Sequence, residues 1–93
     1  MISLGIYGWF FEQFTSKQGA DYADNGNGRT AAATAVDFDK NGAGVKTLTA
    51  WKALADQGYA PNVGRGGDAG LADFSAGKAA MTLGSTASLK QIL

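Results

Sequence analysis

The hydrophobic pattern alternates between strand-like and helix-like stretches, and glycines separate them. Residues 3–7 (Ser-Leu-Gly-Ile-Tyr) have the pattern of a strand end, and residues 9–17 follow with a helical pattern that Gly19 closes. The run of Asp, Asn and Gly at residues 24–29 predicts irregular backbone, because glycine and asparagine favour turns. A short extended piece is expected at residues 35–38.

The clearest helical pattern covers residues 44–57. Its apolar residues recur three to four positions apart, which places them on one face of a helix. This predicted apolar face consists of Val45, Leu48, Trp51 and Ala55. Gly58 stands at the position where helices commonly end, and Pro61 prevents continuation.

The last third of the chain predicts short elements joined by glycines. After a glycine loop at residues 62–67, Asp68 is expected to cap a short helix that ends at Gly77. Residues 78–83 predict a short buried strand, and Ser85 is expected to cap a final helix. The apolar residues of that final helix are Leu89, Ile92 and Leu93.

Composition indicates a small globular piece and narrows the possible functions. The 93 residues allow one small domain at most, and 45% hydrophobic with 17% charged residues is typical of globular chains. Eight basic and eight acidic side chains give no net charge and form no basic cluster, so nucleic-acid binding through a charged face is not expected. No apolar run approaches the roughly 20 residues of a membrane span.

The absence of two residue types limits the chemistry of this chain. Without cysteine it forms no disulfide and no thiolate site. Without histidine it offers no serine–histidine triad, no histidine-ligated zinc site and no histidine general base. We expect no cofactor and no metal.

One segment resembles the first half of a calcium-binding loop. Asp37-Phe38-Asp39-Lys40-Asn41-Gly42 places oxygen ligands at loop positions 1, 3 and 5 and a glycine at position 6. Position 12 needs a bidentate carboxylate, and here it is Leu48. The segment therefore predicts a turn with a helix cap.

A second segment, Gly84-Ser85-Thr86, offers two hydroxyls and free backbone amides at a predicted helix start. Such groups suit an anion, for instance a phosphate. The alternative is that Ser85 only caps the helix. The residues alone leave both interpretations open.

Aromatic residues are concentrated directly after the first predicted strand, in Gly8-Trp9-Phe10-Phe11-Glu12-Gln13-Phe14. A strand that passes into a helix at such a corner is a frequent ligand site in α/β proteins. Most of the large aromatics are expected in the core, namely Phe10, Phe11, Phe14, Trp51 and Phe74. Trp9 is the candidate for a ligand contact.

Three blocks together resemble one family, the substrate-binding proteins of ABC importers, specifically the sn-glycerol-3-phosphate and sugar receptors. The blocks are the aromatic segment at residues 8–14, Asp24-Asn25-Gly26-Asn27-Gly28-Arg29, and the segment from Phe74 through Gly77-Lys78-Ala79-Ala80-Met81-Thr82-Leu83-Gly84-Ser85-Thr86. They occur in the family's order and cover nearly the whole chain.

The resemblance implies a fold and a set of ligand contacts. Family members have two lobes, each a sheet covered by helices, with the solute in the cleft between them. Residues 1–93 would be a partial lobe, from the C-terminal lobe, α/β by parentage and mostly helical with two or three short strands. In these receptors two aromatics three positions apart stack on the ligand. The second falls on Trp9; the first falls on Ile6, which cannot stack, so Tyr7 takes its place as candidate. The matching pair of small hydroxyl residues falls on Ser85 and Thr86.

The function that this resemblance implies is solute capture without chemistry. The chain is expected to belong to the substrate-binding component of an ABC uptake transporter that binds sn-glycerol-3-phosphate or a related sugar or polyol. The expected partner is a membrane permease, and the expected location is periplasmic or extracellular, with the signal or lipid anchor outside this fragment. Because a partial lobe exposes part of its core, self-association is also expected.

Two alternatives from other classes remain. A carbohydrate-active enzyme would use Glu12, the one glutamate of the chain, with an aspartate as its partner. Hydrolysis of a glycoside that is lost in Glu12→Gln would favour that interpretation. A non-catalytic structural or interaction module is the other alternative.

Overall fold

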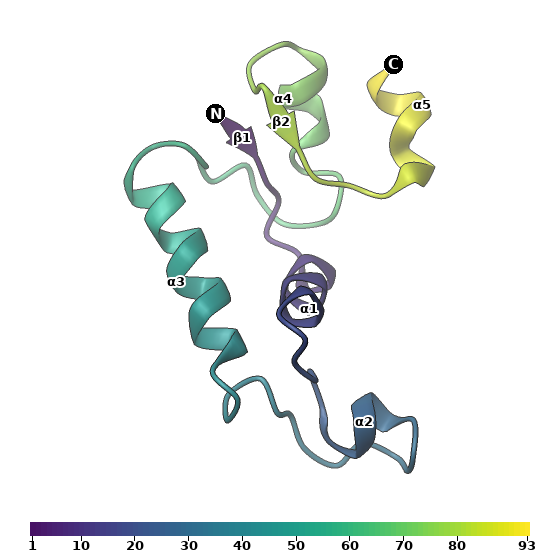
Figure 1. The fold of residues 1–93 in the computed structure, drawn as a ribbon. Coiled ribbons are helices and arrows are strands. Elements are labelled where there is room, and N and C mark those ends of the chain that lie inside the picture. The colour runs from purple at the N-terminus through teal and green to yellow at the C-terminus, as the bar shows by residue number, and fades with distance from the viewer. The chain divides into compact units, whose positions relative to one another are not determined.

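The computed structural model describes residues 1–93, which divide into two compact units. The first unit contains residues 1–7 and 51–93, and the second contains residues 8–50. Figure 1 shows the elements in chain order: β1 (Ile2–Ser3), α1 (Gly8–Lys17), α2 (Asp24–Gly28), α3 (Ala43–Asp56), α4 (Leu71–Ser75), β2 (Met81–Thr82), the 3-10 turn η1 (Thr86–Ser88) and α5 (Leu89–Ile92). Each unit is described by itself.

A short parallel strand pair forms the centre of the first unit. β1 pairs with β2 in the register Ile2 with Met81 and Ser3 with Thr82. The Thr82 hydroxyl adds a hydrogen bond of 2.9 Å to the Ser3 carbonyl. α4 packs against both strands and against α5.

The segment after β1 stays extended and pairs on its other side with the glycine loop. The Ile2 amide donates to the Tyr59 carbonyl at 2.7 Å, and the Ile6 amide donates to the Gly64 carbonyl at 2.9 Å. The Gly66 amide returns a 3.0 Å bond to the Ile6 carbonyl. Since successive residues of a strand direct their backbone groups to opposite edges, residues 2–6 lie between β2 on one side and residues 59–66 on the other.

Glycines allow the close packing of this unit. A Cβ atom on Gly5 would lie 2.3 Å from the Gly66 carbonyl oxygen, and one on Gly70 would lie 2.7 Å from the Ser3 carbonyl oxygen. Ser3 itself is fully buried. The buried apolar residues of the unit are Leu4, Ala60, Leu71 and Ala79.

Two predictions for this part of the chain are wrong. The strand predicted at residues 78–83 has only two residues, and Met81 within it is 60% exposed. Asp68 does not cap α4, whose N-cap is Gly70 without a side-chain hydrogen bond. The Asp68 carboxylate instead accepts a 3.4 Å bond from the Ser88 hydroxyl, so a contact between distant segments replaces the local cap.

In the second unit, α1 is joined to the start of α3 by Gln18. Its side-chain amide donates to the Ala43 carbonyl at 3.2 Å and to the Thr47 hydroxyl at 2.9 Å. Phe10 and Thr15 are the buried residues of α1. The helix ends as predicted, with Gly19 in the left-handed region at φ 72°.

Three aromatic rings of this unit pack together. Phe11 and Phe38 meet edge to face with centroids 5.0 Å apart, and Tyr22 lies 4.8 Å from Phe38. A Cβ atom on Gly44 would lie 2.9 Å from Cδ2 of Phe38 and 3.3 Å from Cζ of Phe11. The cluster therefore requires a glycine in the first turn of α3.

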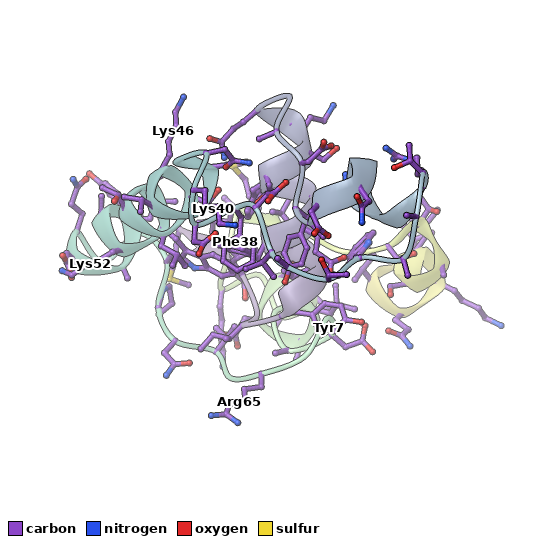
Figure 2. The ribbon with its side chains drawn as sticks, turned by 90° about the horizontal axis from the view of Figure 1, so that it is seen from below. Tyr7, Phe38, Lys40, Lys46, Lys52 and Arg65 are labelled. Atoms are coloured by element: carbon purple, nitrogen blue, oxygen red, sulfur yellow. The ribbon has the colours of Figure 1, made fainter.

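The bounds of α3 agree with the prediction, but its buried face does not. Val45 and Leu48 are 66% and 56% exposed, whereas Gly44 and Thr47 are buried. The buried face is turned by roughly 90° from the predicted one, at 100° per residue. Small residues fill it because Phe11, Phe38 and Gln18 approach the helix there. Lys46 extends away from the helix (Figure 2).

The backbone of residues 24–29 departs from regular α-helix, in agreement with the prediction of irregular structure. Asn25, Gly26 and Asn27 have φ of 55°, 62° and 60°, and Gly28 has φ of 77°, so α2 is a left-handed turn. This conformation costs roughly 1–2 kcal/mol per residue for ordinary side chains, and glycine and asparagine tolerate it best. The sequence Asn-Gly-Asn-Gly supplies those two residue types in succession.

Candidate functional site

The two hydroxyl residues predicted to touch a ligand line one pocket in the first unit, which we call the hydroxyl pocket. It has a volume of about 200 Å³ and lies beyond the carboxyl end of β2. Its walls combine hydroxyl residues with apolar ones: Thr82, Ser85, Thr86 and Ser88 with Leu71, Leu89 and Ile92. None of the lining residues is charged.

The hydroxyls of Ser85 and Thr86 differ in their hydrogen bonds within the protein. The Ser85 hydroxyl accepts a 3.2 Å bond from the Ala87 amide and so caps η1, as predicted. Its own proton remains available to an acceptor. The Thr86 hydroxyl makes no hydrogen bond within the protein and is exposed. Capping and ligand contact are therefore compatible at this pair.

The two aromatic candidates do not line the hydroxyl pocket. The Tyr7 ring lies against the loop backbone, because a Cβ on Gly67 would come within 3.1 Å of its Cε1 atom. Trp9 belongs to the second unit, where it is 38% exposed and its ring lies 5.7 Å from that of Phe10. Their stacking on a ligand stays a prediction from the resemblance.

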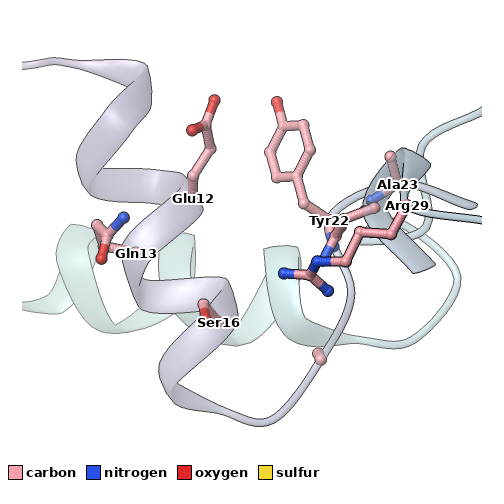
Figure 3. A pocket seen from close by; sticks show the side chains of 8 residues that line it. Glu12, Gln13, Ser16, Tyr22, Ala23 and Arg29 are labelled. Atoms are coloured by element: carbon pink, nitrogen blue, oxygen red, sulfur yellow. Dashed lines mark hydrogen bonds between the residues drawn. The ribbon is translucent and has the colours of Figure 1, made fainter. Parts of the chain in front are cut away.

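A second pocket, the α1–α2 pocket, lies within the second unit and has a volume of about 370 Å³. α1 contributes Glu12, Gln13 and Ser16 to its lining, and Figure 3 shows Tyr22 and Arg29 across from Glu12 and Ser16. Glu12 is the one carboxylate among the lining residues, whereas a glycosidase requires two across its cleft.

Hydrogen bonds of Asn27 and Asn25 hold the α2 wall of this pocket in place. The side-chain oxygen Oδ1 of Asn27 accepts from the Tyr22 and Ala23 backbone amides at 2.7 and 2.9 Å, and its side-chain Nδ2 donates to the Asp21 carboxylate at 3.0 Å. The Asn25 amide group donates to the Ala32 carbonyl at 2.8 Å. The side chains thus satisfy backbone groups that a left-handed turn leaves open.

Asp24 closes the base of the same loop. The Thr34 hydroxyl donates to its Oδ2 at 2.6 Å, and the Thr34 amide donates to its Oδ1 at 2.8 Å. These bonds, the hydroxyl first, lower the pKa of the Asp24 carboxyl below its ordinary value. An antiparallel bridge between Ala23 and Val36 also joins the two ends of this loop.

This arrangement makes a pH-dependent prediction. Because the pKa of Asp24 is lower in the folded chain, its contribution to stability is present above the unfolded value of about 3.9 and is lost as pH falls through the folded pKa. We expect Thr34→Val to raise the pKa of Asp24 toward the ordinary value and to weaken the acid sensitivity of folding. An NMR titration of the Asp24 carboxyl measures this shift.

Thr30→Val is the matched control, since the Thr30 hydroxyl bonds to the Asn25 carbonyl and not to Asp24. It should leave the pKa of Asp24 unchanged. Equal pKa values of Asp24 in the wild type and in Thr34→Val would show that the hydroxyl does not stabilise the carboxylate.

The calcium-like segment forms the predicted turn and helix cap. The Lys40 and Asn41 amides both donate to the Asp37 carbonyl at 3.0 Å. The Asn41 side-chain oxygen accepts a 3.0 Å bond from the Ala43 amide at the start of α3. The side-chain oxygen of Asn41 therefore caps the start of α3.

Sequence reasoning did not identify Tyr22 and Arg29 as site residues. Tyr22 precedes the segment at residues 24–29 that the sequence predicts to be irregular, and Arg29 is its last residue. The Asn-Gly-Asn-Gly repeat was the available signal, since it permits a left-handed turn that fixes the residues on either side.

Comparisons with protein-family models, with curated proteins and with solved structures give no match to this chain. The family resemblance therefore rests on the three sequence blocks alone. Every helix in the structure is too short or too polar to cross a bilayer.

Proposed function

We propose that this chain is part of a substrate-binding protein of an ABC importer and holds a polyol or sugar, such as sn-glycerol-3-phosphate, without chemical conversion. The observation that carries the proposal is the hydroxyl pocket, where Ser85 and Thr86 line one small cavity with apolar residues. Polyols present both hydroxyl groups and a carbon skeleton, and this lining matches both.

The place of the pocket supports the proposal. In α/β proteins, ligands bind beyond the carboxyl ends of parallel strands, and the Gly84–Thr86 loop follows β2 directly. The uncharged lining favours the hydroxyl end of a glycerol phosphate over its phosphate group. We therefore assign the polyol part of the ligand to this pocket.

The proposal predicts a specific effect of Thr86. NMR titration of the chain with sn-glycerol-3-phosphate should shift the amides of residues 82–88, and Thr86→Val should weaken that binding severalfold, on the order of 1 kcal/mol for one lost hydrogen bond. Thr49→Val, on an exposed position of α3, should bind like the wild type.

Shifts confined to residues outside the pocket, or equal binding by Thr86→Val, would contradict the proposal. The same samples test the enzyme alternative. Recovery of the ligand unchanged agrees with a binding protein, and hydrolysis of a glycoside that disappears in Glu12→Gln would support an enzyme instead.

A further inference from the structure

The geometry points to a second ligand site in the α1–α2 pocket, one that takes a small zwitterion of the free amino-acid class. This site lies wholly within the second unit, whereas the hydroxyl pocket lies within the first. Its argument does not depend on the proposed transport function.

Opposite charges line the two walls of this pocket. Glu12 on α1 and Arg29 after α2 are the charged residues among its lining. They form no ion pair with each other, since the ion pairs of the chain are Lys52 with Asp56 and Lys78 with Asp73. Figure 3 shows Arg29 reaching toward α1 from the wall opposite Glu12.

Both charged groups retain hydrogen-bonding capacity. The Glu12 carboxylate has no hydrogen bond within the protein. The Arg29 guanidinium donates one bond, from Nη1 to the Gly26 carbonyl at 3.3 Å. A guanidinium carries five N–H donors, so most of them remain for a ligand.

The α2 wall is fixed in advance, which favours binding. Arg29 follows the left-handed turn that Asn25 and Asn27 hold by side-chain hydrogen bonds. Tyr22, which also lines the pocket, is packed against Phe11 and Phe38. Strained backbone that persists because its surroundings hold it is found at ligand sites more often than elsewhere.

Charge complementarity selects the ligand class. An anion would be attracted by Arg29 and repelled by Glu12. A cation would be attracted by Glu12 and repelled by Arg29. A neutral sugar would displace water from both groups without pairing either charge. An amino acid pairs both, because its carboxylate fits the planar guanidinium fork and its ammonium group donates to a carboxylate.

The size and the neutral lining agree with this class. A volume of about 370 Å³ is in the range of small-molecule pockets, and Gln13 and Ser16 offer hydrogen bonds to a polar side chain. We therefore choose L-serine as the probe, with two analogues. L-serine methyl ester lacks the carboxylate, and N-acetyl-L-serine lacks the ammonium group.

The test is an amide NMR titration of the 93-residue chain with the three compounds. L-serine should shift the amides of Gln13, Ser16, Asn27 and Arg29 in a saturable manner in the millimolar range. Each analogue should bind about tenfold more weakly, the loss of one charge-assisted hydrogen-bonded pair.

Two neutral variants assign the charges to the two walls. Arg29→Gln should weaken L-serine binding about tenfold and abolish the preference over the methyl ester. Glu12→Gln should abolish the preference over N-acetyl-L-serine. Lys46→Gln removes an exposed charge that is not among the lining residues, and it should bind L-serine like the wild type.

Glu12 and Arg29 are exposed, so both variants should fold, and their amide spectra verify this. Equal binding of all three compounds, shifts outside the pocket, or no saturable shift would overturn the assignment. Saturable shifts of the same amides with glucose would also overturn it, since they would show a site for neutral sugars.

Discussion

Gly5→Ala should lower the free energy of unfolding by about 3 kcal/mol, the upper part of the range for overpacked sites. The added Cβ would lie 2.3 Å from the Gly66 carbonyl oxygen and 3.1 Å from the Ala69 Cβ. A backbone carbonyl cannot move aside as a flexible side chain does. Moving it would disturb the bond that it accepts from the Ala69 amide and the bond from the Gly66 amide to the Ile6 carbonyl. Chemical denaturation of the variant measures the loss.

Gly8→Ala provides the matched control for this substitution. Gly8 opens α1 without positive φ, and a Cβ atom there would have nothing within 4 Å. Alanine should be neutral or stabilise by up to about 1 kcal/mol, because it restricts the unfolded chain. If Gly5→Ala unfolds at the same denaturant concentration as the wild type, the glycine loop does not pack on residues 5 and 6 as described.

Elements that depend on neighbouring residues could be predicted from the sequence. α1 and α3 follow from apolar spacing, and the glycines at their ends, Gly19 and Gly58, have positive φ as their positions require. The turn at Asp37 and the Ser85 cap are also local, since each is a side chain bonded to nearby backbone. Such features need no knowledge of the rest of the fold.

Features that depend on contacts between distant segments could not be predicted from the sequence. The buried face of α3 depends on Phe11 and Phe38, whose rings require Gly44 rather than Val45 beneath them. The pairing of β1 joins residues 1–7 to the other end of the chain, and no local pattern shows its register. The same limit applies to Asp68, whose carboxylate bonds to Ser88.

Of the two candidate sites, one is formed by residues adjacent in sequence and the other joins residues that are distant in sequence. Ser85 and Thr86 are adjacent in sequence, so their presence in one pocket follows from the loop that carries them. The α1–α2 pocket instead brings Glu12 together with Arg29, 17 positions later, through a left-handed turn. Hydrophobic periodicity contains no information about such a turn, because it depends on backbone angles and not on burial.

Phe38→Ala should cause the other large loss of stability, about 2–3 kcal/mol. Full truncation of a buried phenylalanine costs roughly 3–5 kcal/mol, and Phe38 is half-buried. The variant would lose the edge-to-face contact with Phe11 and the contact with Tyr22, and it would leave a cavity above Gly44. Thermal and chemical denaturation measure the change, with Val36→Ala, 41% exposed in the wild type, expected within about 0.5 kcal/mol.

A double-mutant cycle separates ring packing from simple loss of apolar area. Phe11→Ala and Phe38→Ala should show a coupling energy of about 1 kcal/mol, as expected for an aromatic pair in contact. Because Tyr22 lines the α1–α2 pocket and packs on Phe38, the Phe38→Ala variant should also bind L-serine more weakly than Val36→Ala does. Additive losses in the cycle, with unchanged binding, would mean that the three rings neither stabilise one another nor hold the pocket wall.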